Sequence, residues 1–182
     1  MPDVTDPSDM IDGPDVIDGP DVIDALAADH RDIEAILRGG VDARRTAVLV
    51  ATLVRHEVAE QEYVYPTVAE SAPSGERLAD RGRAQHAQLD ETMQQLSATD
   101  PSDPDFRRLV DALAQEIQRH LRYDVTELFP ALRQVCSRAD LARLGEHLAT
   151  VPTAEAVPDG VPRHRGNLLD QVRETLQRRT PG

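Results

Sequence analysis

Residues 56–66 read HEVAEQEYVYP, and residues 120–130 read HLRYDVTELFP. In both segments a histidine precedes a carboxylate by four residues, as His56 and Glu60, then as His120 and Asp124. Side chains four residues apart on an α-helix lie one turn above each other on the same face. The two segments therefore predict two helices that each present an imidazole and a carboxylate side by side.

Apolar residues around these segments recur every three or four positions, the period of a helix with one buried face. Stretches rich in glycine, proline and aspartate separate four such regions. The regions predict helices over about Asp21–Arg38, Asp42–Glu70, Glu76–Ala98 and Pro104–Val135. Long amphipathic helices with short connections favour an all-α fold, an antiparallel up-and-down four-helix bundle.

Each predicted helix carries one histidine in register with its apolar face. These are His30, His56, His86 and His120. A single such histidine is more often a hydrogen-bonded core residue than a ligand. Here two of the four also have a carboxylate one turn later, and a buried carboxylate without a cationic partner is costly. The four histidines with Glu60 and Asp124 therefore predict a metal site inside the bundle.

The number and type of these residues bear on the metal. Four imidazoles and two carboxylates are more than one tetrahedral zinc ion needs, and no thiolate accompanies them. Bridging carboxylates favour two hard ions, and helical bundles often hold di-iron or di-manganese sites. We expect Glu60 and Asp124 each to bridge two iron ions, with the histidines divided between the ions.

Four strings of the sequence resemble, in order and spacing, the ligand helices of the hemerythrin-like (HHE cation-binding) domain. They read DHRDIEAIL, HEVAEQEYVYP, QHAQLDETM and HLRYDVTELFPAL. The resemblance covers about residues 21–150. It implies two non-haem iron ions with an oxo or hydroxo bridge and an open position for dioxygen, peroxide or nitric oxide. The iron ligands that it implies are His30, His56, Glu60, His86, His120 and Asp124.

The sequence departs from the family pattern at two positions. Asp124 stands where related domains usually have glutamate, so one bridge would be a methylene shorter. Asp90 stands one turn after His86, where oxygen-carrying hemerythrins have a further histidine. Asp90 could be a seventh ligand, a partner for His86 or a solvated residue, and the last two interpretations are favoured.

Other residues near the motifs have simpler interpretations. Tyr63 and Tyr123 could line a ligand pocket, but packing in the core with the hydroxyl at the rim is favoured. Proline removes a helical hydrogen bond, so Pro66 and Pro130 are interpreted as kinks or helix ends without a chemical role. The remaining histidines, His147 and His164, are not expected to be ligands.

Three functions remain open on these residues. The first is a di-iron protein that binds or reacts with dioxygen, peroxide or nitric oxide, including a peroxide- or nitric-oxide-consuming oxidoreductase. The second is an iron- or redox-sensing regulatory module that signals to an unidentified protein partner. The third, a metal-free helical scaffold, ranks last.

The ends of the chain differ in composition from the predicted bundle. Residues 1–20 repeat aspartate at every third position and contain Gly-Pro pairs, which predicts a disordered acidic tail. The predicted bundle covers residues 21–150 and includes a short fifth helix over about Ala139–Thr150. The pattern of residues 151–182 predicts a Pro-rich linker and then an amphipathic helix near Asn167–Arg179.

The composition of the chain limits which partners the protein is expected to bind and where in the cell it is expected to be. A net charge of −13 argues against a nucleic-acid partner. No apolar run reaches the length of a membrane span, and the N-terminus lacks the pattern of a secretory signal. The lone Cys136, interpreted as a buried structural thiol, cannot form an intramolecular disulfide. We expect a cytoplasmic protein.

Overall fold

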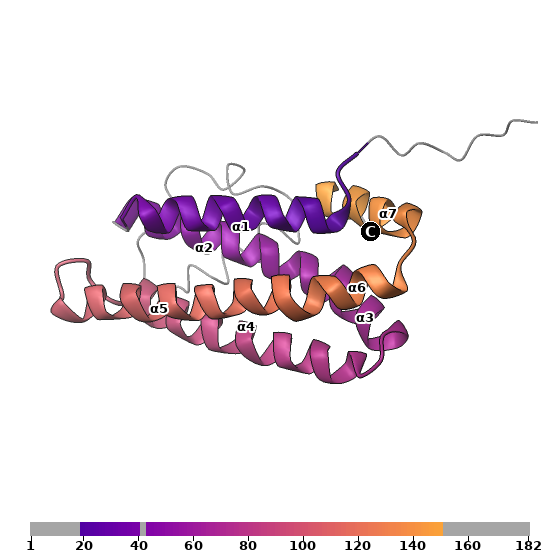
Figure 1. The fold of residues 1–182 in the computed structure, drawn as a ribbon. Helices are drawn as coiled ribbons and strands as arrows, with labels where there is room; N and C mark the ends of the chain where they lie inside the picture. Colours follow the sequence, from indigo (N-terminus) through magenta and orange to yellow (C-terminus); the bar gives the residue numbers. More distant parts are fainter. Residues whose placement is uncertain (1–18, 41–42, 151–182) are drawn as a thin grey trace, which may run out of the picture.

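The computed structural model describes residues 19–40 and 43–150, and it is helical in all of its regular elements. Four long helical segments form a bundle in which consecutive segments run antiparallel, which confirms the predicted fold (Figure 1). The elements in chain order are α1 (Val22–Arg38), α2 (Ala43–Ala59), η2 (Glu60–Val64), α3 (Tyr65–Ser71), α4 (Gly75–Ala98), α5 (Pro104–Tyr123), η3 (Asp124–Leu128), α6 (Phe129–Val135) and α7 (Arg138–Thr150). The segments labelled η are single π-helical turns.

The helix boundaries follow from local chemistry. The Asp21 side chain accepts a hydrogen bond from the Asp24 backbone N–H and so caps α1. Asp103 caps α5 in the same way through the N–H of Asp105, with Pro104 in the first turn. Gly39 ends α1, and Gly40 after it has a positive φ of 79°, a conformation that glycine adopts without strain.

The second and fourth bundle segments are each interrupted by a π-helical turn, which the sequence pattern did not predict. The N–H of Tyr65 donates to the Glu60 carbonyl, and the N–H of Phe129 donates to the Asp124 carbonyl, five residues back in each case. Each turn precedes a proline, which has no N–H to continue the α-helical ladder. The helices continue beyond Pro66 and Pro130 as α3 and α6, so the prolines end neither segment.

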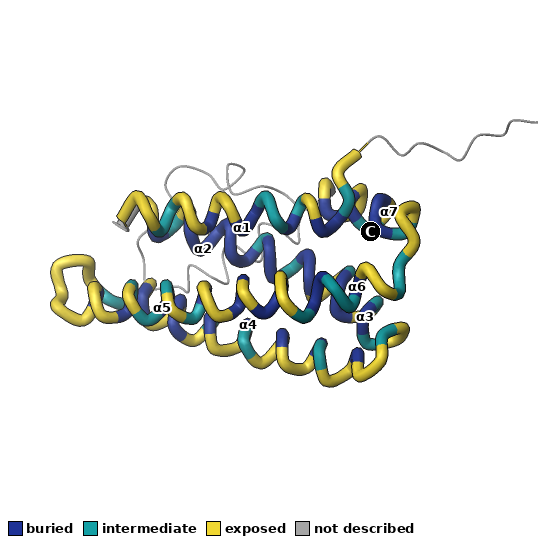
Figure 2. The backbone as a smooth tube through the Cα atoms, in the orientation of Figure 1, coloured by how far each residue is buried: buried dark blue, intermediate teal, exposed yellow. Residues whose placement is uncertain are grey.

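The buried residues face the inside of the bundle (Figure 2), and the apolar ones among them form two clusters, with the buried histidines and carboxylates between them. One apolar cluster joins α1, α2, α4 and α5, with Leu53 and Ile117 among its fully buried residues. The other joins the beginnings of α1 and α4 to α3, α6 and α7, with Val68 and Leu132. The polar layer between them is thus shielded from water by aliphatic side chains.

The fifth helix begins one residue before its predicted start and packs against α1. Gly145 makes this packing possible, because a Cβ there would lie 2.4 Å from the Pro20 carbonyl oxygen. Cys136, between α6 and α7, is partly exposed where full burial was expected, and burial still raises the pKa of its thiol. The predicted acidic tail, apart from residues 19 and 20, and the predicted C-terminal helix lie outside the described residues.

Among the described residues, no helix is both long and apolar enough to cross a membrane.

Candidate metal centre

The six residues singled out from the sequence come together from four helical segments. His30 lies on α1, His56 on α2, His86 on α4 and His120 on α5. The two carboxylates, Glu60 and Asp124, are the first residues of the two π-helical turns. His30, with 7% exposure, is the least buried of the six, and the others are at most 1% exposed.

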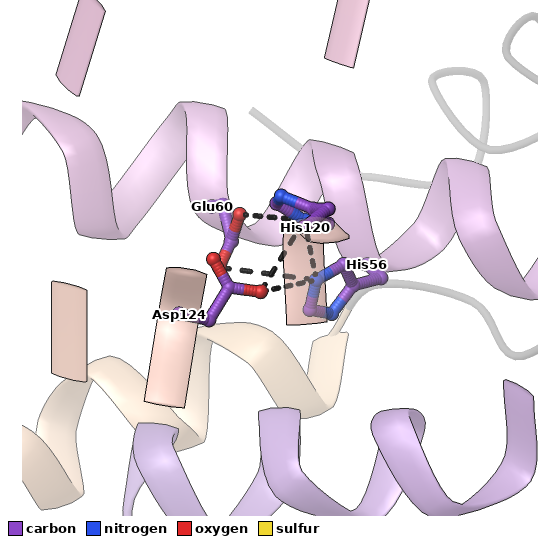
Figure 3. A group of neighbouring side chains, drawn as sticks. All are labelled: His56, Glu60, His120 and Asp124. Carbon is purple, nitrogen blue, oxygen red and sulfur yellow. Dashed lines mark hydrogen bonds and ion pairs between the residues drawn. The ribbon is translucent and has the colours of Figure 1, made fainter. Parts of the chain in front are cut away.

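His56, Glu60, His120 and Asp124 form the centre of this cluster (Figure 3). Each offers a ligand atom, and these four atoms lie within 4.8 Å of one another. The two Nε2 atoms of the histidines are 3.3 Å apart, and each lies within 3.8 Å of an oxygen of both carboxylates. A metal ion could therefore take ligands from both motifs at once.

The other two histidines extend the cluster in opposite directions. His86 Nε2 lies 3.2 Å from Glu60 Oε2, and His30 Nε2 lies 3.3 Å from Asp124 Oδ2. Each carboxylate thus has its own flanking imidazole, and the two halves are related by an approximate twofold arrangement of the helices.

Burial sets the protonation of these groups. It lowers the pKa of His56 to about 3 and that of His120 to about 4, although the nearby carboxylates act in the opposite direction. Burial and the charge of Asp124 raise the pKa of Glu60. The imidazoles of His56 and His120 are therefore neutral at pH 7, which is the form that binds metal.

Several donor atoms of the cluster have no hydrogen-bond partner among the described residues. They are His30 Nε2, Glu60 Oε1, Asp124 Oδ1 and Asp124 Oδ2, and all are buried. Burying such atoms without a partner is costly. A cation between the helices would satisfy all of them, so the donor set fits a metal ion.

Two glutamines lie close to the Nδ1 atoms of His120 and His86, the ring nitrogens that point away from the carboxylates. Gln85 Oε1 lies 3.3 Å from His120 Nδ1, and the Gln61 amide lies 3.3 Å from His86 Nδ1. Contacts of this kind fix the ring orientation of a metal-binding histidine.

The corresponding residue for His56 is the buried Asp29. Its Oδ2 lies 4.0 Å from His56 Nδ1, and its other oxygen is hydrogen-bonded to Arg55. Burial raises the pKa of Asp29 to about 6, because the loss of hydration outweighs the attraction of Arg55. Asp29 is still mostly ionised at pH 7 and can stabilise a His56 that donates from Nδ1.

Tyr65 is an additional residue that contacts both a carboxylate and a histidine of the cluster. Its fully buried hydroxyl donates to Glu60 Oε2 at 2.7 Å and lies 3.1 Å from His86 Nε2. Burial and the Glu60 charge raise its pKa, so the phenol stays protonated and remains a donor. Gly82 makes room for it, because a Cβ at that position would lie 2.5 Å from the Tyr65 hydroxyl oxygen.

The π-helical turn explains why the helical pattern of the sequence did not indicate Tyr65 as a cluster residue. A residue five positions after Glu60 would point away from it on an α-helix, whereas the wider turn brings both to the same side. The signal was the tyrosine directly before Pro66. The second motif has Phe129 there, and its ring stacks on His30 with centroids 5.5 Å apart.

The two tyrosines considered from the sequence have other partners. Tyr63 stacks on the exposed His147 of α7, with ring centroids 5.5 Å apart. The Tyr123 hydroxyl donates to the Leu78 carbonyl at 2.6 Å. Asp90 is partly buried one turn after His86 and lies outside the group of four central residues. His164 lies outside the described residues.

Comparison with known families agrees with this arrangement. The family model for the hemerythrin HHE cation binding domain matches residues 21–132, which is more than half of the chain. The chain belongs to this family. The HHE domain of this protein thus contains a buried cluster of histidine, glutamate and aspartate that could hold metal.

A solved structure supports the fold. A hemerythrin HHE cation binding domain-containing protein from Mycobacterium kansasii superposes with a TM-score of 0.64 at 20% sequence identity. The match covers 72% of this chain and 84% of that one. No match is found among the curated proteins.

Proposed function

We propose that this HHE domain is a non-haem di-iron protein that binds or reacts with dioxygen, peroxide or nitric oxide. The observation that carries the proposal is the pair of buried carboxylates, each placed between histidines of different helices and each with at least one oxygen atom that lacks a hydrogen-bond partner among the described residues. Two carboxylates in that position suit two ions better than one.

The six residues named from the sequence would hold the iron pair, with Glu60 and Asp124 as bridges beside an oxo or hydroxo group. When bound, the pair would supply redox chemistry and an open position for the small molecule. The protein's own part is to exclude water with the two aliphatic layers and to orient the imidazoles through Asp29, Gln61 and Gln85. Tyr65 would contribute a hydrogen bond to one bridge only, since Phe129 has no hydroxyl.

Iron analysis and absorption spectroscopy of aerobically loaded protein test this proposal. We expect about two iron ions per chain and oxo-bridge charge-transfer bands. His56→Ala should lose both, while His147→Ala, a change at an exposed histidine outside the cluster, should keep both. Iron content below about one per chain in the wild-type protein would contradict a di-iron site.

Assays of peroxide and nitric oxide consumption by the loaded protein would separate an enzyme from a carrier. Both are compatible with the same ligands, because they differ in pocket access and redox potential.

A regulatory module is the second candidate, and the placement of α7 favours it. This helix packs on α1, which carries His30, and its His147 stacks on Tyr63 in the π-helical turn that begins with Glu60. A change in metal occupancy could thus alter how α7 docks. Limited proteolysis of metal-free and iron-loaded protein tests this: equal cleavage rates after residue 137 in the two forms would remove its support. A cytoplasmic location and the absence of a nucleic-acid partner stay predictions.

A further inference from the structure

The two halves of the metal centre differ in what covers their flanking histidines. The approximate twofold relation between the halves makes His86 equivalent to His30. It also makes Gln61, which follows Glu60, equivalent to Val125, which follows Asp124. Gln61 is polar and reaches the Nδ1 atom of His86. Val125 has no polar side-chain group to offer His30, and the residue is 57% exposed.

The half around His86 is closed. Tyr65 and His86 lie with ring centroids 5.4 Å apart, and the phenol fills the space that Gly82 leaves on α4. Together with Gln61 these contacts leave His86 only 1% exposed.

The half around His30 opens to the surface. A depression of about 510 Å³ lies between α1 and η3, and His30 is part of its wall. The other lining residues are Asp24, Ala27, Arg31, Glu34 and Val125. His30 Nε2 is buried and faces Asp124, while the His30 side chain, which is 9% exposed, is part of the wall of the depression. Of the six cluster residues, only His30 lines this depression, so a molecule that approaches from this side meets its imidazole first.

We propose that this depression is the port through which a small molecule reaches the metal centre. The inference rests on the proposed small-molecule function and adds the side of approach, together with the residues that control it. Ala27 on α1 and Val125 on η3 supply the apolar part of the lining of the depression. Asp24 and Glu34 outnumber Arg31 on the rim, so the port favours a small uncharged molecule, such as nitric oxide, over an anion.

Chemical labelling of the metal-free protein tests the port without iron. Diethyl pyrocarbonate acylates accessible neutral imidazoles, and peptide mapping by mass spectrometry reports each histidine separately. We expect His30 to react several-fold faster than His86, His56 and His120. Val125→Trp should slow His30 labelling several-fold. Val48→Trp is the matched control, since Val48 is 43% exposed on α2 and does not line the depression.

Equal labelling rates for His30 and His86, or equal effects of the two tryptophan variants, would overturn the port. Ala27→Leu narrows the opposite wall and gives a second variant should Val125→Trp disturb η3.

Stopped-flow binding of nitric oxide to the reduced, iron-loaded protein adds a kinetic test. Val125→Trp should lower the association and dissociation rates by the same factor and leave Kd unchanged, because a constriction changes the barrier and not the bound state. An unchanged association rate would overturn the port. A wild-type protein that retains no iron would instead contradict the di-iron proposal, and the labelling result would still decide on the port.

Discussion

Gly82→Ala offers the sharpest test of how the structure builds the site. In the middle of a helix, alanine normally stabilises by about 1 kcal/mol over glycine. Here the new Cβ would lie 2.5 Å from Oη, 2.6 Å from Cζ and 2.7 Å from Cε1 of Tyr65. The phenol is fully buried and hydrogen-bonded to Glu60, so it cannot move aside freely.

The magnitude follows from these contacts. Overpacking a buried site costs about 1–3 kcal/mol, and losing a hydrogen bond to a charged acceptor adds about 1.5–3 kcal/mol. After subtracting the gain in helix propensity, Gly82→Ala should destabilise the protein by at least about 1 kcal/mol.

The effect of Gly82→Ala on the free energy of unfolding should change sign when the Tyr65 phenol is absent. In a Tyr65→Leu background, the three atoms that clash with the Cβ are gone, because leucine is too short to reach them. Gly82→Ala should then stabilise by about 1 kcal/mol. The coupling between the two positions is therefore at least about 2 kcal/mol.

Urea unfolding of the four proteins of this cycle, without metal, measures the free energies of unfolding. The same Gly82→Ala effect in both backgrounds, within about 0.5 kcal/mol, would refute the packing argument. Repeating the series with bound metal would show whether the Tyr65 hydrogen bond also affects metal retention.

Three further predictions concern the groups around the cluster. Tyr65→Phe removes the donor to Glu60 Oε2, so it should lower the free energy of unfolding by about 1.5–3 kcal/mol in urea titrations at a pH at which Glu60 is ionised. Asp29→Asn weakens the support of His56 Nδ1 and should reduce metal affinity about 10–100-fold in chelator competition. The third prediction concerns pH. Burial lowers the pKa of His56 to about 3 in the folded protein, whereas the same imidazole in the unfolded chain binds a proton near pH 6.5. The free energy of unfolding of the metal-free protein should therefore fall as the pH decreases from 6.5. His56→Asn should reduce the slope of unfolding free energy against pH by about 1 kcal/mol per unit over pH 4–6.

Each of these three predictions would be contradicted by a specific result. Equal unfolding curves for Tyr65→Phe and wild type would mean that its hydroxyl contributes nothing to stability. Unchanged metal affinity in Asp29→Asn would leave His56 held by packing alone. A parallel pH profile for His56→Asn would place the acid sensitivity on other groups.

The sequence alone determined the bundle and the composition of the cluster. Helical periodicity places His30, His56, His86 and His120 on apolar faces, and helices with one apolar face have few ways to bury it other than against one another. The spacing of four residues between each histidine and its carboxylate is likewise a local property of a helix.

The differences between the two halves of the cluster follow from contacts between helices and from the π-helical turns. The π-helical turns shift the register after Glu60 and Asp124, so that Tyr65 and Phe129 face the cluster against the expectation for an α-helix. Gly82 lies on another helix, and no local pattern links it to Tyr65. Whether His30 or His86 is exposed depends on side chains that meet across helices, and contacts between distant residues are set by packing, which sequence periodicity does not encode.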